Sequence, residues 1–501
     1  MSNIRRQSII SSLVIYVGFA VGLLNVYFFT KEGLFTEAQY GLTTVFIAIA
    51  TMMSTFASFA MPSYIYKFYP YYKDHLPERR NDMLSWALLT GLIGFILVMI
   101  AGWLLKDLVI RKYGTNSPLL VVYYYWIFPL GLGLTIYSIL EAYTWSIGKS
   151  VITNFFKEVQ WRLFTSILIL LFLLNIIKDF DLFIKLFAFT YPGIALGLIA
   201  YLFYTGQLHL SLKVSKVSRR FLKKIILFCS FFYGAMLIQT LSKVFDSFVI
   251  ASVLDDGLDK AGVFALATVV TSIIQAPQRG IVSAAVPHLS RAWKEKNMEL
   301  LQRVYQRSSI NQLLFACGIF LLIWLNFRDG VITFGLKPVY LDAAWVFFVL
   351  GITIIIDMGT GVNSQIIVTS TYWKFELISG VILLIIMLPL TYLLTKQYGI
   401  IGPAIATMIS MSTYNLIRII FLWKKFRLIP FTIKSLYTIL LAAVCYAICY
   451  FLFQNMHGIT GMIVRSILFI TLYATGALYM NLSPDIEPVL LNAKRRLGIK
   501  R

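Results

Sequence analysis

Apolar residues gather in long stretches along the whole chain, and short polar segments separate these stretches. Each stretch has about twenty residues or more, which at ~1.5 Å per residue in a helix is enough to cross a hydrocarbon core ~30 Å thick. Backbone amides inside a bilayer need partners within the protein, and these stretches are too long and too continuously apolar for the strands of a barrel. The pattern therefore predicts about fourteen membrane-spanning helices, at residues 8–29, 41–65, 83–105, 118–142, 151–175, 181–204, 221–253, 261–287, 305–326, 341–369, 373–395, 399–422, 431–453 and 460–480.

Composition agrees with this pattern. The chain has 501 residues, of which 59% are hydrophobic and 13% are charged, whereas about 25% of the residues of a soluble domain are charged. The stretch 151–175 departs from the pattern because it contains Lys157, Glu158 and Arg162. The fold class predicted is an all-α polytopic membrane protein. Neither a disulfide framework nor a metal site is expected, because the histidines lie far apart and all four cysteines fall within predicted spans, at Cys229, Cys317, Cys445 and Cys449.

The formal net charge of +22 is explained by where the basic residues lie. Successive connections alternate between the two sides of the membrane, and most Lys and Arg fall on one side. This side receives Arg5 and Arg6 at the N-terminus, the basic connections at 66–82, 205–224, 289–307 and 418–434, and the basic C-terminal tail. Such asymmetry predicts that both termini are cytoplasmic. The positive charge then reflects topology and contact with anionic lipids, and no nucleic-acid partner is expected.

Two parts of the chain look like copies of one another. The segment FTEAQYGLTTVFIAIATMMSTFASFAMPSYIYKF from Phe35 is similar to LDKAGVFALATVVTSIIQAPQRGIVSAAVPHLSRA from Leu258, with Pro62 aligned to Pro287. Apolar helices also align by chance. However, the turn at Lys149 and the turn at Lys374 are separated by the same number of residues as Pro62 and Pro287. Six spans separate the copies, so both halves begin on the same side, as in parallel repeats related by an axis along the membrane normal.

The repeat predicts two six-helix lobes related by a pseudo-two-fold axis. The predicted parts are an N-lobe, a cytoplasmic linker, a C-lobe, two further helices and a basic cytoplasmic tail, at residues 1–204, 205–220, 221–425, 426–480 and 481–501. This is the arrangement of alternating-access transporters, whose site lies between the lobes.

Three motifs, in order along the chain, resemble those of the multidrug/oligosaccharidyl-lipid/polysaccharide (MOP) exporter superfamily. They are LSKVFDSFVIASVLDDGLDKAGVFALA (241–267), FTEAQYGLTTVF (35–46) and QYGIIGPAIATMIS (397–410). Within the superfamily the chain is most similar to the bacterial polysaccharide flippases. That resemblance implies transport of undecaprenyl-diphosphate-linked oligosaccharide from the cytoplasmic to the outer leaflet, for O-antigen or exopolysaccharide synthesis in the cell (inner) membrane.

One departure bears on the substrate. The related lipid II flippases hold the diphosphate with arginines on their first, second and eighth helices. Arg279 on the eighth span fits such a position, but beyond Arg6 the first two spans contain no arginine. The resemblance therefore favours an oligosaccharide substrate over lipid II.

Charged residues within the seventh span are candidates for the site. A charge near the bilayer centre costs ~2.5–3.5 kcal/mol or more, so it needs water, a partner or a ligand. Gln239, Lys243 and Asp246 share one helical stripe. Three interpretations are open: an ion pair sealed between helices, a helix that ends near Ser242 with both charges at the outer interface, or a stripe facing the cavity. In the last, Lys243 attracts the diphosphate, and Asp246 orients it or titrates with a coupling ion.

The eighth and tenth spans add further candidates. In IIQAPQRG (273–280), Gln275 and Arg279 lie near a predicted kink at Pro277. The Arg279 guanidinium can bind phosphate in a bidentate manner, although it could also reach the cytoplasmic headgroups. In IDMGTGVNSQ (356–365), Asp357 lies in mid-span beside two glycines that loosen the helix or allow close packing. The predicted substrate-binding residues are Arg279, Lys243, Gln275 and Gln239, with Asp246 and Asp357 as coupling or ion-pair residues.

Other functions fit less well. An ion-coupled multidrug or cation exporter of the same fold would favour an acidic cavity, whereas the candidate charges are balanced. A membrane enzyme would need catalytic groups on a sizeable outer loop, and the predicted outer loops are short. The expected protein is therefore a monomeric transporter without a cofactor, whose partners are the lipid-linked oligosaccharide, membrane lipids and a coupling ion, H⁺ or Na⁺.

Overall fold

The computed structural model describes residues 2–485, without the side chains of residues 2–9, 11 and 12. Arg5, Arg6 and the basic residues of the C-terminal tail therefore lie outside the described side chains. The described residues form helices and connecting turns, and thirteen of their helical segments are long and apolar enough to cross a membrane. The all-α membrane fold predicted from the sequence is confirmed. The chain divides into two compact units, one up to Gly262 and one from Val263 onward.

The first unit contains fifteen helical elements, three of them short 3₁₀ or π segments, and α13 begins at its end. In chain order these elements are α1 (Ser2–Thr30), α2 (Glu37–Ser58), α3 (Met61–His75), η1 (Glu78–Arg80), α4 (Met83–Leu104), α5 (Lys106–Tyr113), α6 (Pro118–Val122), η2 (Tyr124–Trp126), α7 (Ile127–Ser146), α8 (Ser150–Asn154), η3 (Phe155–Gln160), α9 (Trp161–Leu173), α10 (Phe180–Phe187), α11 (Thr190–Tyr204) and α12 (Lys216–Val253).

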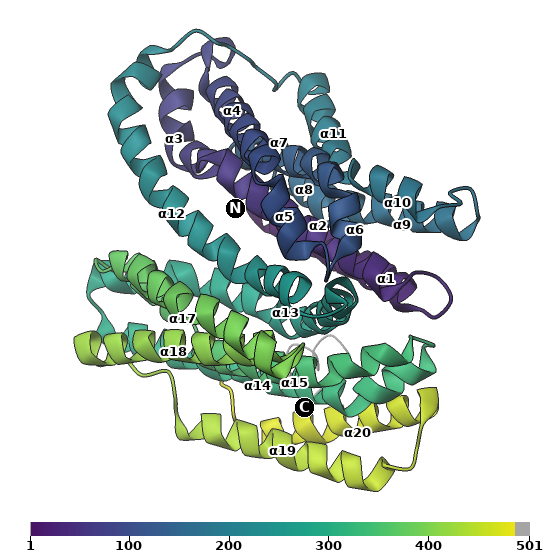
Figure 1. Ribbon diagram of the computed structural model, residues 1–501. Coiled ribbons are helices and arrows are strands. Elements are labelled where there is room, and N and C mark those ends of the chain that lie inside the picture. The colour runs from purple at the N-terminus through teal and green to yellow at the C-terminus, as the bar shows by residue number, and fades with distance from the viewer. Residues whose placement is uncertain (1, 486–501) are drawn as a thin grey trace. The chain divides into compact units, whose positions relative to one another are not determined.

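Close helix packing holds the first unit together. Helix α7 lies against α2, α3, α4 and α11, and the long α12 packs on α2 and α3 (Figure 1). Small residues permit these approaches: a Cβ on Gly94 would lie 2.1 Å from the backbone oxygen of Ala57, and one on Gly133 would lie 2.2 Å from the nitrogen of Pro192. Lipid tails are as apolar as the helix surfaces, so such close contact supplies the attraction between helices in a membrane.

The second predicted span ends earlier than expected. The prediction of one helix over 41–65 is wrong, because α2 ends at Ser58 and α3 begins at Met61. Phe59 and Ala60 between them have left-handed backbone angles, with φ of 44° and 59°. Pro62 lies in the first turn of α3, where its missing N–H costs no helical hydrogen bond.

The charged stretch 151–175 also differs from the other predicted spans. It forms three consecutive helical segments, α8, η3 and α9, and η3 is a π-helical turn over Phe155–Gln160. This stretch is not among the thirteen apolar segments. A π-turn holds an extra residue and is often found at functional sites.

The second unit contains the remaining nine elements. In chain order they are α13 (Gly257–Glu295), α14 (Met298–Thr333), η4 (Pro338–Asp342), α15 (Ala343–Gly359), α16 (Asn363–Thr369), α17 (Lys374–Tyr398), α18 (Ile401–Phe426), α19 (Ile433–Phe453) and α20 (Gly458–Tyr479), of which α13 starts within the first unit.

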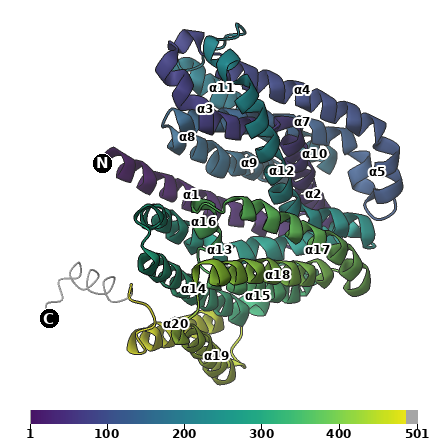
Figure 2. The same ribbon diagram turned by 90° about the vertical axis from the view of Figure 1, so that its left-hand side faces the viewer.

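Helix α14 organises the second unit. It packs against α15 on one side and against the antiparallel pair α19 and α20 on another, as Figures 1 and 2 show. The apolar contact with that pair includes Cys317 of α14, Cys445 and Cys449 of α19 and Phe469 of α20, all buried. All four cysteines of the chain are buried, as expected for thiols within apolar spans.

The tenth predicted span is interrupted where its glycines lie. Helix α15 ends at Gly359 and α16 begins at Asn363, and Gly361 between them has a φ of +69°. L-residues with side chains rarely adopt that angle, so the glycine allows the break. The prediction of one helix over 341–369 is therefore wrong, and of the two roles left open for the glycines, loosening the helix is the one seen at Gly361. The lobe boundaries expected from the repeat stay a prediction.

Candidate functional site

The polar stripe of the seventh predicted span lies on α12 in the first unit. Because α12 is uninterrupted to Val253, the interpretation in which a helix ends near Ser242 is wrong. Gln239 and Lys243 are exposed and Asp246 is half-buried. The three side chains therefore have the helical spacing expected, and their role in binding or coupling stays a prediction.

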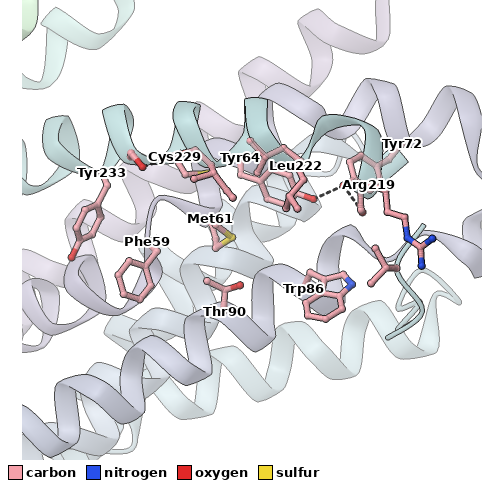
Figure 3. A pocket seen from close by; sticks show the side chains of 15 residues that line it. Phe59, Met61, Tyr64, Tyr72, Trp86, Thr90, Arg219, Leu222, Cys229 and Tyr233 are labelled. Atoms are coloured by element: carbon pink, nitrogen blue, oxygen red, sulfur yellow. Dashed lines mark hydrogen bonds between the residues drawn. The ribbon is translucent and has the colours of Figure 1, made fainter. Parts of the chain in front are cut away.

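An apolar cavity of about 540 Å³ lies beside the same helix, between α3, α4 and α12. Its walls are mostly aromatic and aliphatic side chains. Figure 3 shows Tyr233 and Phe59 towards one end and Arg219 beyond Leu222 at the other. The cavity thus offers a hydrophobic lining with a cation at one end.

Hydrogen bonds fix the wall of this cavity near Arg219. The hydroxyl of Tyr64 donates to that of Tyr72 at 2.8 Å, and the Tyr72 oxygen lies 2.7 Å from Ser218 Oγ (Figure 3). Ser218 in turn donates to the carboxylate of buried Asp82. This chain of contacts links α3, α4 and α12. These hydrogen bonds therefore hold the three helices that form the cavity wall in a fixed arrangement.

A charged cluster lies on the π-turn of the first unit. Arg162 donates to the Glu158 carboxylate at 2.7 Å, and Lys157 pairs with Glu141 of α7 at 3.1 Å. The backbone oxygen of Arg162 also accepts a hydrogen bond from Asn25 of α1 at 2.8 Å. The charges in this unusual span are therefore paired and anchored to neighbouring helices.

Helix α1 lies directly on this charged turn. A Cβ added to Gly18 would be 2.3 Å from the backbone oxygen of Glu158, and one on Gly22 would be 2.9 Å from Arg162 Nε. The guanidinium of Arg162 thus lies against the first helix, although it belongs to α9. The sequence analysis considered arginines within the first two spans, so it did not predict that Arg162 would contact the first helix. The three charged residues within 151–175 were the sequence signal that could have pointed to this contact.

In the second unit, Asp357 of α15 is held by amide groups from two other helices. Asn415 Nδ2 of α18 donates to its Oδ1 at 3.0 Å, and Gln278 Nε2 of α13 lies 3.4 Å from its Oδ2. The sequence prediction selected Asp357 and the segment 273–280 separately, and the structure brings Gln278 of that segment to Asp357. Both donors are neutral amides, so they satisfy hydrogen bonds of the carboxyl group without adding a charge beside it.

The same amide network extends towards a buried ion pair. Asn415 also accepts hydrogen bonds from Asn363 at 2.9 Å and from Thr360 at 3.3 Å. One helical turn further along α18, Arg418 bonds to Glu376 of α17, and only 5% of the Arg418 side chain is exposed. Sequence analysis did not select Asn415 or Arg418, although polar residues in an apolar span were a usable signal.

The predicted site residues divide between the two units. Gln239, Lys243 and Asp246 lie in the first, and Gln275, Arg279 and Asp357 lie in the second. Arg279 is exposed and Gln275 is half-buried on α13, which continues as one helix through Pro277. A common cavity for the two groups stays a prediction.

The thirteen apolar helical segments of membrane-spanning length in the described part of the chain define a multi-pass membrane protein. Its sequence matches the family described as "Polysaccharide biosynthesis protein" over residues 4–293, and the chain belongs to that family. No curated relative matches the chain with significance.

Solved structures of transporters share the fold. A lipid II flippase, MurJ, in an inward closed conformation superposes with a TM-score of 0.74, covering 94% of this chain and 99% of its own at 16% identity. An inward-facing multidrug resistance MATE transporter of the MOP superfamily gives 0.63, with 83% and 94% covered at 16% identity. A MOP superfamily transporter from Pyrococcus furiosus gives 0.54, with 84% and 95% covered at 16% identity. The chain thus has the MOP superfamily fold expected from its motifs.

Proposed function

We propose that the protein is a flippase that moves an undecaprenyl-diphosphate-linked oligosaccharide from the cytoplasmic to the outer leaflet of the bacterial cell membrane, for synthesis of a cell-surface polysaccharide. The observation that carries this proposal is the near full-length likeness to a flippase for a lipid-linked substrate, in a chain of the polysaccharide biosynthesis family. Transport by alternating access between two lobes, without a chemical reaction, is part of the proposal.

The headgroup of such a substrate requires cations. We assign substrate binding to Arg279, Lys243, Gln275 and Gln239, because a guanidinium binds phosphate in a bidentate manner and an ammonium attracts it as a point charge. Asp246 and Asp357 are assigned to coupling. The neutral amides around Asp357 support this assignment, because a carboxylate without a fixed counter-charge can take up H⁺ or Na⁺.

The lipid part of the substrate requires an apolar surface. The cavity between α3, α4 and α12 supplies one, and Arg219 at its end suits the junction between an isoprenoid chain and its diphosphate. This amphipathic lining supports a lipid-linked substrate over a fully water-soluble one.

Two alternatives each have an observation in their favour. An ion-coupled multidrug or cation exporter is favoured by the likeness to the MATE transporter and by the carboxylate of Asp357. Lipid II transport is favoured by Arg162, whose guanidinium reaches the first helix from α9, where the first two spans contain no arginine beyond Arg6.

Reconstitution tests the proposal directly. Proteoliposomes are loaded with fluorescent undecaprenyl-diphosphate oligosaccharide, and the probe that reaches the opposite leaflet is quantified for wild type, Arg279→Ala and Lys243→Ala. The matched control is Lys396→Ala, a cation exposed at the end of α17. Loss of translocation in the first two variants, with folding and the control unchanged, supports the proposal. Wild-type translocation in both would refute the assigned site, and transport of organic cations or lipid II instead would favour the alternatives.

A further inference from the structure

A second cavity, of about 580 Å³, lies within the second unit between one face of α13 and one face of α14. Small residues, among them Gly280 and Ala284, form its α13 wall. On α14 the lining residues Arg303, Arg307 and Asn311 recur at intervals of four, so they share one face of the helix. Two guanidinium groups and an amide therefore converge on a space that small residues keep open.

The chain places one of its own carboxylates in this cavity. After α20, the segment through Ser483 returns to α14, and Asp485 lines the cavity. Arg307 donates from Nε to Asp485 Oδ2 at 2.8 Å and bonds with its terminal nitrogen to Oδ1, and Asn311 Nδ2 also donates to Oδ2. Leu482 and Ser483 are buried and anchor this segment. The carboxylate thus receives the forked, bidentate contact that arginine makes with planar and tetrahedral oxyanions.

The cavity keeps positive charge even with this carboxylate in place. Arg307 and Asp485 neutralise each other, while Arg303 has no hydrogen-bond or ion-pair partner among the described residues. His288 on α13 also lines the cavity. Arginine stays protonated, so Arg303 contributes a full charge to the remaining space.

We propose that this cavity binds a phosphate group, with Arg303, Arg307 and Asn311 as its ligands, and that Asp485 holds the place of the phosphate while the site is empty. A phosphate presents more acceptor oxygens than a carboxylate, so it can bond to Arg303 and Arg307 together. Arg279 does not line this cavity, and the proposal stands independently of the transport function.

Two sources supply this chemistry: a soluble phosphate or diphosphate, and the headgroup of an anionic lipid. The predicted cytoplasmic connection at 289–307 includes both arginines, and anionic headgroups attract basic residues at that surface. The two sources share the same ligands on the protein and differ in whether a lipid tail is needed.

The test uses the purified full-length protein in detergent. Isothermal titration with inorganic pyrophosphate measures the soluble arm. Native mass spectrometry with phosphatidylglycerol, against phosphatidylcholine as the zwitterionic reference, measures the lipid arm. The variants are Arg303→Ala, Arg307→Ala and Asp485→Asn, with Lys294→Ala as the matched control because Lys294 is exposed on α13 outside the cavity.

The expected result is saturable binding in one arm, about tenfold weaker in each arginine variant because a charge-assisted hydrogen bond is lost. Asp485→Asn removes the competing charge, so binding should strengthen several-fold, while Lys294→Ala changes nothing. Binding of pyrophosphate identifies a soluble ligand, and binding of phosphatidylglycerol alone identifies a headgroup.

A steric variant separates the site from the stability of the fold. A Cβ on Gly280 meets nothing within 4 Å, so Gly280→Leu fills the cavity without a backbone clash. It should abolish binding while the unfolding temperature stays near that of the wild type. No saturable binding in either arm, or equal affinity in wild type, Arg303→Ala and Gly280→Leu, would overturn the proposal.

Discussion

The buried ion pair between Arg418 and Glu376 should behave asymmetrically when it is broken from either side. Glu376→Gln leaves a guanidinium, 5% exposed, without its counter-charge. Arg418→Met leaves a carboxylate whose side chain is 28% exposed and which Ser364 still contacts at 2.8 Å. The double variant removes both charges and keeps similar volumes. We therefore expect Glu376→Gln to be the most damaging of the three.

The magnitudes follow from the burial of each partner. Removing one member of a fully buried pair costs ~3–5 kcal/mol, because the remaining charge is uncompensated. Water reaches Glu376 in part, so we expect ~2–3 kcal/mol for Glu376→Gln and ~1–2 kcal/mol for Arg418→Met. Replacing a whole buried pair with neutral groups is often close to neutral. The double variant should therefore recover most of the loss.

Unfolding of the purified protein in mixed micelles, followed by far-ultraviolet circular dichroism, measures these differences as a double-mutant cycle. Glu299→Gln, an exposed carboxylate in the first turn of α14, is the control and should be silent. Additive losses in the double variant would refute the reasoning, since they would mean that the two groups do not stabilise each other.

Three further predictions concern other parts of the chain. Gly18→Val should destabilise the protein by ~1–3 kcal/mol, because its Cβ would lie 2.3 Å from a backbone oxygen of η3; Gly234→Val, where a Cβ meets nothing within 4 Å, is the control, and equal unfolding of the two would contradict the packing. Asp357→Asn should abolish the response of transport to an imposed pH or Na⁺ gradient in proteoliposomes while unfolding stays near that of the wild type; a retained response would exclude coupling at this position. The hydrogen bond from Arg307 holds the pKa of Asp485 below its usual value, so the stability from this contact is complete above pH ~4 and disappears as the pH falls through the folded-state pKa. The contact is partly exposed and faces two other basic groups of the cavity, so we expect it to contribute less than ~1 kcal/mol to the free energy of unfolding. The measurement is the difference in unfolding free energy between wild type and Asp485→Asn, which should shrink in acid. A difference that persists in acid would refute this prediction.

Much of the fold was predictable from local sequence. Transfer of a helix into a bilayer depends on the composition of about twenty consecutive residues, so the apolar spans could be located without knowing their neighbours. The glycines near Gly361 were recognised as residues that could loosen a helix, but the stretch 341–369 was predicted as one span and the break itself was not. The end of α2 at Ser58 was not predicted, since the apolar pattern continues through the left-handed residues Phe59 and Ala60.

The candidate site was predictable only as single residues. Asp357 was selected because a charge in mid-span requires a partner, but its partner Asn415 lies 58 residues away in the chain. Arg162 contacts Asn25 of the first helix across 137 residues. Such pairings depend on which helix faces meet, and helical periodicity within one span carries no information about a distant one.

By itself, the sequence determined that the chain enters a membrane, where its apolar stretches lie and which residues carry charge into them, because these properties depend on composition and on 3.6-residue periodicity. Only the tertiary structure decided that α1 rests on the charged π-turn, that amides surround Asp357, and that Asp485 lies in the cavity beside Arg307. The physical reason is that electrostatic and hydrogen-bond energies act over a few ångströms, so they are set by the packing of helices that are distant in the chain.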